Sequence, residues 1–380
     1  MEASGATRRL PLGRARARPN RGLTRRYEDE LRLFRTRSAQ AGLAALIAVW
    51  ALLPVMVTDD FWLSVLNYAG ITAIGAIGLN LLTGYTGQVS LGHAFFLGVG
   101  AYAAAQLGGE LDLPLVLWLP GAALVGALIG AAVGPFALRL RGNYLVIVTL
   151  GLVFLGEHLF RNLDSVTGGN SGTSVVAPVS IGPIDFAELT LLGSGYTLNQ
   201  GYFWLIWGLV AICALLVKNI VRTRPGRALQ AVRDRDLAAE VIGVRLGRYK
   251  VGAFAVSSAL AAMAGAMYGS YQQFVSPSEW SLFLSIQYIA IIIVGGVGTI
   301  FGSVLGALFL GGLPSLIERY SDSIPGVSTG AGGEGFISVF SLNQVIFGAL
   351  IVLFLIFEPR GLAAIWLRVK GYFKSWPFSY

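Results

Sequence analysis

Long runs of apolar residues, separated by short polar or glycine-rich stretches, fill most of this chain between residues 41 and 357. A helix needs about 20 apolar residues to cross the hydrocarbon core of a bilayer, with a range of roughly 17 to 25. We predict a membrane-spanning helix in each run of this length: 41–57, 62–83, 89–107, 114–138, 143–162, 201–221, 250–270, 280–298, 300–318 and 341–357. The pattern therefore predicts an all-α, polytopic bundle of about ten transmembrane helices.

One stretch inside this pattern does not suit a helix that faces lipid. Residues 83–93 read TGYTGQVSLGH, which is too polar and too rich in glycine. Non-helical backbone at membrane depth persists only where protein or a water-filled cavity covers it. We therefore expect a broken or re-entrant element beside a translocation path, with a short cytoplasmic turn as the alternative.

Neutral polar side chains in and near this stretch are the candidates for a substrate pathway. An imidazole at membrane depth is a functional candidate by default, although it also serves to tie a broken helix to its neighbour. Neutral amides and hydroxyls suit the passage of a zwitterion without a deep binding well. The predicted pathway residues are Asn80, Gln88, Ser90, Gly92 and His93.

Composition and charge indicate an integral membrane protein. It is 55% hydrophobic and 13% charged, whereas soluble domains carry about 25% charged residues. The net charge of +8 is concentrated before residue 38, between 222 and 250, and after 360. Basic residues beside membrane spans set topology and contact anionic headgroups, so we expect membrane lipid, not nucleic acid, as their partner.

The distribution of basic residues also predicts the topology. The positive-inside rule places both termini and the 222–250 loop in the cytoplasm, for a protein integral to the plasma (inner) membrane. The glycine-rich connections 163–200 and 319–340 then lie outside. We divide the chain into a disordered basic cytoplasmic N-terminal tail (1–37), a transmembrane domain (38–360) and a cytoplasmic C-terminal tail (361–380).

The loop from 222 to 250 has a helical pattern of its own. Thr223-Arg224-Pro225-Gly226 is a helix-start signal, and Gly243 ends a second short helix that carries Ala238, Ala239 and Ile242 on one face. An amphipathic loop of this kind is typical of a docking platform for a cytoplasmic protein. An interfacial helix on lipid headgroups is the alternative, but acidic residues interrupt the basic face that lipid binding needs.

Several chemistries are excluded by what the sequence lacks. Two isolated histidines and the single Cys213 cannot form a tetrahedral metal site, and we expect no cofactor. There is no Gly-x-x-x-x-Gly-Lys-Ser/Thr phosphate loop, so the chain is not expected to be an enzyme that hydrolyses ATP. We interpret Glu157 with Arg161 as a surface ion pair. The glycines at 126, 130, 134, 302 and 306 are interpreted as close-packing faces between helices.

Longer motifs resemble a known family. Gly78–Ala105, Arg139–Leu152 and Ile291–Leu310 closely resemble the high-affinity branched-chain amino-acid permeases, over about residues 40 to 360. Ala238-Ala239-x-x-x-Gly243 resembles the Glu-Ala-Ala-x-x-x-Gly coupling motif of ABC importer permeases, with Leu237 in place of the glutamate. The resemblance implies one of two homologous permease subunits, paired with cytoplasmic ABC ATPase subunits and an extracytoplasmic substrate-binding protein. It assigns coupling to the ATPase to Ala238, Ala239 and Gly243, and we add Arg227 of the same loop to these candidates.

We therefore expect a permease that moves branched-chain or related hydrophobic amino acids by alternating access, driven by separate ATPases. A permease of the same family for urea, short amides or aromatic acids is the nearest alternative. An ion-coupled secondary transporter is a second one, although it would be expected to carry paired intramembrane carboxylates or matching broken-helix repeats. The predicted spans contain no Asp or Glu at mid-depth. A structural membrane scaffold would leave the helical loop unexplained.

Overall fold

The computed structural model describes residues 37–57, 59–138, 144–191, 194–321, 327–328 and 337–375. The chain divides into two compact units, residues 1–52 and 53–380. The described part of the first unit is the beginning of helix α2 (Arg37–Met56). Most of the predicted N-terminal tail, and most of the 319–340 connection, lie outside the described residues.

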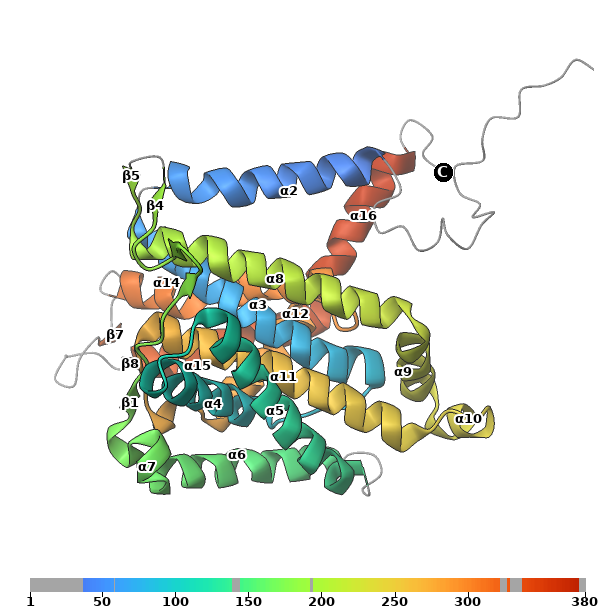
Figure 1. The fold of residues 1–380 in the computed structure, drawn as a ribbon. Helices are drawn as coiled ribbons and strands as arrows, with labels where there is room; N and C mark the ends of the chain where they lie inside the picture. Colours follow the sequence, from blue (N-terminus) through green and yellow to red (C-terminus); the bar gives the residue numbers. More distant parts are fainter. Residues whose placement is uncertain are drawn as a thin grey trace, which may run out of the picture. The chain divides into compact units, whose positions relative to one another are not determined.

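The second unit is almost entirely helical (Figure 1). Its short strands form two-residue ladders: β1 (Thr173–Ser174) with β6 (Phe274–Val275), β2 (Ser180–Ile181) with β3 (Ile184–Asp185), β4 (Thr190–Leu191) with β5 (Ser194–Gly195), and β7 (Val327–Ser328) with β8 (Ile337–Ser338). Its helices are α3 (Asp60–Thr86), α4 (His93–Ala104) with a π-helical end (Ala105–Glu110), α5 (Leu115–Leu138), α6 (Tyr144–Asn162), α7 (Asp164–Thr167), α8 (Leu198–Arg222), α9 (Arg224–Asp234), α10 (Asp236–Val241), α11 (Leu246–Gln272), α12 (Leu282–Gly295), α13 (Ile300–Leu310), α14 (Leu313–Tyr320), α15 (Val339–Phe357) and α16 (Gly361–Ser375).

The prediction of an all-α, polytopic membrane protein is confirmed. Among the described residues, seven helical segments are long and apolar enough to cross a membrane. The three other predicted spans coincide with shorter or interrupted helices, which are the apolar part of α2 (Gln40–Met56), α4 and α12. Seven full-length crossings and three shorter apolar helices thus account for the ten apolar runs.

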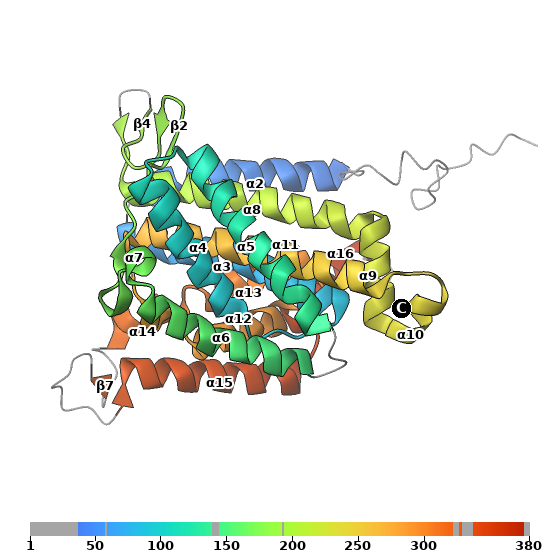
Figure 2. The same ribbon diagram turned by 60° about the horizontal axis from the view of Figure 1, so that its bottom comes forward.

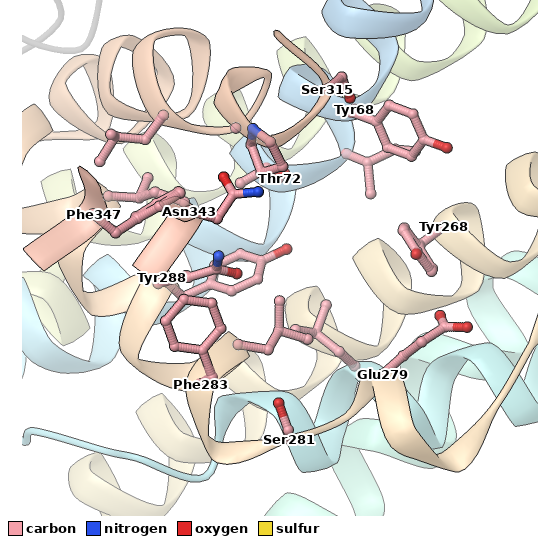
Figure 3. Close-up of a pocket in the computed structure, with 18 of the residues that line it drawn as sticks. Tyr68, Thr72, Tyr268, Glu279, Ser281, Phe283, Tyr288, Ser315, Asn343 and Phe347 are labelled. Atoms are coloured by element: carbon pink, nitrogen blue, oxygen red, sulfur yellow. The ribbon is translucent and has the colours of Figure 1, made fainter. Parts of the chain in front are cut away.

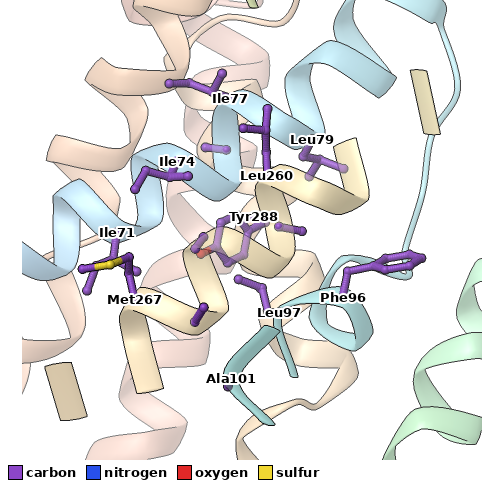
Figure 4. Packing of buried hydrophobic residues seen from close by; sticks show 14 of the residues in the cluster. Ile71, Ile74, Ile77, Leu79, Phe96, Leu97, Ala101, Leu260, Met267 and Tyr288 are labelled. Atoms are coloured by element: carbon purple, nitrogen blue, oxygen red, sulfur yellow. The ribbon is translucent and has the colours of Figure 1, made fainter. Parts of the chain in front are cut away.

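Helices α3 and α11 form the centre of the second unit. In the most apolar 18-residue stretch of α3, 83% of the residues are buried within the protein, against 6% in the corresponding stretch of α15. A helix that is apolar on all sides belongs in the interior of a bundle or in lipid. Ile71, Ile74 and Ile77 of α3 pack with Leu260 and Met267 of α11 (Figure 4). The exposed apolar side chains of α15 are therefore suited to lipid or to another subunit.

Glycines allow the close approach of several helices, as predicted. A Cβ added at Gly126 in α5 would lie 2.4 Å from the Ala262 Cβ in α11, and one at Gly130 would lie 2.5 Å from the Ser258 Oγ. A Cβ at Gly306 in α13 would lie 2.1 Å from the Ile291 carbonyl oxygen in α12. The predicted packing faces are confirmed at these positions.

Residues 83–93 form the broken element that the sequence predicts, not a short turn. Helix α3 ends at Thr86, residues 87–92 are non-helical, and α4 begins at His93. The Tyr288 ring contacts His93 and also lies against Gly75, near the middle of α3. Helix α4 therefore begins opposite the middle of α3, and the non-helical segment runs back alongside the bundle to reach it (Figure 4).

Candidate functional site

The predicted two-helix loop lies at one end of the second unit, and the β2–β3 hairpin lies at the opposite end (Figures 1 and 2). Helix α9 begins after Thr223 with a proline in its first turn, as predicted. Helix α10 ends at Val241, and Gly243 takes a left-handed φ of 90°. A Cβ at Gly226 would lie 2.1 Å from the Val221 carbonyl oxygen, so only glycine fits this tight α8–α9 corner.

Helix α10 presents an apolar face to solvent. The side chains of Leu237, Val241 and Ile242 are 72%, 87% and 74% exposed. Ala238 is exposed as well, whereas Ala239 is buried because α10 packs back against α9 and α11. The predicted common face of Ala238, Ala239 and Ile242 is therefore wrong with respect to Ala239. A compact exposed apolar patch of this kind marks an interaction surface.

Two other residues predicted to couple the loop to an ATPase, Arg227 and Gly243, are exposed as well. Arg227 is exposed on α9, and its Nη1 donates a weak hydrogen bond to the Arg222 carbonyl at 3.4 Å. Gly243 is exposed at the end of α10. The structure thus leaves Arg227, Ala238 and Gly243 accessible, and it adds Leu237 and Val241 to the surface.

Arg233, near the end of α9, connects this loop to the transmembrane helices. Its Nη1 donates a 2.6 Å hydrogen bond to the Gly84 carbonyl in the last turns of α3. Its aliphatic part lies against Gly87, and Nη1 lies 3.0 Å from the position that a Cβ at Gly298 would occupy. Arg233 thus joins α9 to the end of α3 and lies beside the turn between α12 and α13.

Asn80 fixes that same turn. Its Nδ2 donates to the Thr299 carbonyl at 2.8 Å and to the Ser303 Oγ at 2.6 Å, and its Oδ1 accepts from the Gly298 N–H at 2.8 Å. A buried amide that makes these bonds holds two helices together. Of the predicted pathway residues, Asn80 is the one with a clear structural task.

Of the other four predicted pathway residues, Gln88, Ser90 and Gly92 lie in the non-helical segment and His93 begins α4. Gln88 and Ser90 are buried, and the Ser90 Oγ accepts from the Gly92 N–H at 3.2 Å. Gly92 lies against Thr149 of α6, whose Oγ1 accepts from the Leu91 N–H at 3.0 Å. The buried His93 ring lies 4.8 Å from the Tyr288 ring centroid, and its Nε2 has no hydrogen-bond partner among the described residues.

The structure holds a cavity of about 480 Å³ (Figure 3). Helix α14, which lines it, lies at the end of the second unit opposite α9 and α10 (Figures 1 and 2). Side chains of α3, α4, α11, α12, α14 and α15 line the cavity, together with the 3₁₀ turn Pro277–Glu279. None of the five predicted pathway residues lines this cavity. His93, at the start of α4, contacts the ring of Tyr288, which does line the cavity.

The cavity is apolar on several sides, and its polar lining combines two carboxylates with neutral hydroxyl and amide groups. Ile71, Leu97 and Ile291 contribute alkyl surface, and Glu279 and Glu318 contribute carboxylates. The described residues that line it include no Lys, Arg or His. Burial raises the pKa of the Glu279 carboxyl, and hydrogen bonds from Ser276 partly oppose that shift. Sequence analysis missed this site because its residues come from distant helices.

The predicted ion pair is also present, and it lies apart from the cavity. Arg161 Nη2 lies 2.8 Å from Glu157 Oε1 on the surface of α6, so this pair is confirmed as a local contact. Among the described residues, no group of three or more His, Cys, Asp and Glu side chains is placed to hold a metal ion.

Comparison with known proteins gives consistent matches. A family model described as "Branched-chain amino acid transport system / permease component" matches residues 61–355. The high-affinity branched-chain amino acid transport system permease protein LivM of Salmonella typhimurium is 30% identical over 333 residues, which cover 84% of this chain and 74% of LivM. The ribose import permease protein RbsC of Haemophilus influenzae is 26% identical, over 73% of this chain and 85% of RbsC. No solved structure matches.

Proposed function

This chain belongs to the family of branched-chain amino acid transport system permease components, and from that premise we propose that it is the membrane-spanning subunit of a binding-protein-dependent ABC importer. Its proposed cargo is a branched-chain or related hydrophobic amino acid. Its proposed partners are cytoplasmic ATPase subunits, a second homologous permease subunit and an extracytoplasmic substrate-binding protein. In this arrangement both termini and the α9–α10 loop are cytoplasmic, and the cavity opens to the outside.

The observation that carries this proposal is the exposed apolar face of α10. Leu237, Val241 and Ile242 are among the most exposed large apolar side chains of the described residues, and they lie on a short helix that projects from the bundle. A lipid-facing helix would keep a basic polar face, yet Asp234, Asp236 and Glu240 accompany this one. A groove on a cytoplasmic ATPase subunit is the binding surface that fits this face best.

The connection from this face to the membrane supports a coupling role. Arg233 joins α9 to the Gly84 carbonyl of α3, and Asn80 joins α3 to the turn before α13. Movement of α9 on ATP binding would therefore shift the end of α3, the turn and the adjoining non-helical segment together. That segment carries Gln88, Ser90 and Gly92, and His93 follows it, in contact with the Tyr288 ring. We assign the inward path to these residues and the outer vestibule to the cavity.

The test is a charge substitution on the proposed docking face. The triple variant Leu237→Asp, Val241→Asp, Ile242→Asp is expected to lose the ATPase subunits on affinity purification from membranes. Substrate uptake should fall at least tenfold, because a desolvated apolar contact becomes three buried charges. The amount of chain inserted in the membrane should not change, because these side chains are exposed and contribute little to the fold.

A matched control places the same charges at the other end of the molecule. Val176, Ile181 and Ile184 are also exposed apolar residues, and they lie around the β2–β3 hairpin. Changing all three to Asp should leave co-purification of the ATPase intact. If the α10 variant retained its ATPase subunits and its uptake, the assignment of α10 as the coupling surface would be wrong.

A further inference from the structure

Glu279 occupies an unusual position in the wall of the cavity. It ends the 3₁₀ turn Pro277–Glu279, which connects α11 to α12. Its Oε1 accepts from the Ser276 N–H at 3.2 Å and from the Ser276 Oγ at 3.4 Å, so it completes a capping box. One carboxylate oxygen is thus anchored by the backbone of the turn.

The second oxygen of Glu279 has no such anchor. Oε2 is covered, and no described group meets the geometry of a hydrogen bond to it, although the Tyr268 hydroxyl lies near the carboxylate. A covered carboxylate oxygen without a donor costs free energy, on the order of 1–3 kcal/mol or more for a charged group. A buried polar atom without a partner calls for an explanation, and a donor supplied by a ligand is the one that we develop here.

The surroundings of Glu279 determine what kind of donor fits. The cavity holds a second carboxylate, Glu318, and the described residues that line it supply no cationic side chain. The adjacent Arg319 is engaged elsewhere, because its guanidinium lies 3.8 Å from an Asp59 oxygen and 4.0 Å from the Phe61 ring centroid. With two carboxylates and no cationic side chain among the described lining residues, a cationic donor is favoured.

The remainder of the cavity wall suits an aliphatic body. Ile71, Leu97 and Ile291 line it together with Tyr288, which Figure 3 shows in the wall. A volume of about 480 Å³ falls within the roughly 300–1,000 Å³ that small-molecule sites occupy.

We propose that this cavity binds an aliphatic molecule with a primary ammonium group, which Glu279 receives while the hydrocarbon chain lies against Ile71, Leu97 and Ile291. The proposal rests on the proposed function, since it assigns the permease its own contact with an amino-acid cargo. It also separates that cargo from ureas, amides and aromatic acids, which carry no ammonium group.

The chain offers a direct reporter for binding in this cavity. Its single cysteine, Cys213, is buried, so a cysteine introduced at Ser281 in the cavity wall becomes the accessible thiol. The Ser281→Cys variant is purified as the full chain with the subunits that accompany it. The rate of maleimide labelling is then measured with leucine, with 3-methylbutylamine, which lacks the carboxylate, and with 4-methylpentanoate, which lacks the ammonium group.

Leucine and 3-methylbutylamine should slow labelling at least threefold at saturation, and 4-methylpentanoate should not. Adding Glu279→Gln should raise the half-protecting amine concentration roughly tenfold or more, as expected for loss of a charged hydrogen bond. Glutamine also serves in a capping box, so the turn is retained. The matched variant Glu318→Gln should change that concentration less than twofold, because its carboxylate is not assigned to the ligand.

Equal protection by the carboxylic acid, protection that survives Glu279→Gln, or no protection by any of the three molecules would overturn the ammonium site. This assay needs neither ATP nor uptake. Its failure is therefore distinct from failure of the proposed function, which would appear as a wild-type transporter without ATP-driven amino-acid uptake.

Discussion

Asn80 illustrates how far a single residue can be interpreted from the sequence. A polar amide within an apolar run is expected to be buried and hydrogen-bonded. In the structure Asn80 is buried and makes three hydrogen bonds. Its partners, however, are Gly298 and Ser303, which lie 218 and 223 residues further along the chain. No local pattern reveals a partner at that distance. Sequence analysis therefore found the residue but not its role in holding the turn before α13.

Replacing Asn80 with leucine tests this role at the residue scale. The change leaves the partly buried Gly298 N–H and Thr299 carbonyl without their partner. Loss of a partner costs about 1–3 kcal/mol for a fully buried group and less for a partly buried one. The thermal unfolding midpoint of the purified chain, followed by tryptophan fluorescence, should fall clearly. Asn162→Leu is the control, because that exposed amide bonds only within its own helix end. Equal midpoints for the two variants would contradict the role given to Asn80.

At the scale of elements, the sequence predicted where the helices lie better than it predicted which helices pack together. The apolar runs predicted where helices lie, and the four-residue glycine spacing predicted close packing. Neither showed which helices meet, because a small residue permits an approach without naming the partner. The C-terminal tail was predicted without a helix, yet residues 361–375 form α16, where Gly361 lies against Gly296 and Trp366 against Phe301. Its contacts with α12 and α13 join segments that are distant in the chain, and its own sequence does not show them.

The contact between α4 and α11 gives the sharpest prediction at this scale. A Cβ at Gly265 would lie 1.8 Å from the Leu97 carbonyl oxygen, and backbone cannot move aside as a side chain can. Gly265→Ala should therefore destabilise the fold by about 1–3 kcal/mol or more through overpacking. Gly348→Ala in α15 is the matched control, because nothing lies within 4 Å of its added Cβ. A thermal midpoint for Gly265→Ala as high as that of the control would refute the close contact.

For the whole molecule, the sequence predicted the class, the family and the loop that projects from the bundle. It did not predict the cavity, whose walls come from helices that are adjacent only after folding. It also misplaced the exposed face of α10, since Ala239 turns inward and Leu237 and Val241 turn outward. Periodicity predicts that a short helix has an apolar face. The packing of α10 against α9 and α11 decides which of its side chains are exposed.

The central claim concerns how the whole molecule is powered, and transport in proteoliposomes tests it most directly. The chain is reconstituted with its co-purifying permease and ATPase subunits, and the binding protein loaded with radiolabelled leucine is supplied on the outside. The account predicts uptake that requires ATP hydrolysis and the binding protein, and that persists when ion gradients are collapsed. Uptake that continues without ATP and stops when the gradients are collapsed would contradict it and identify an ion-coupled transporter.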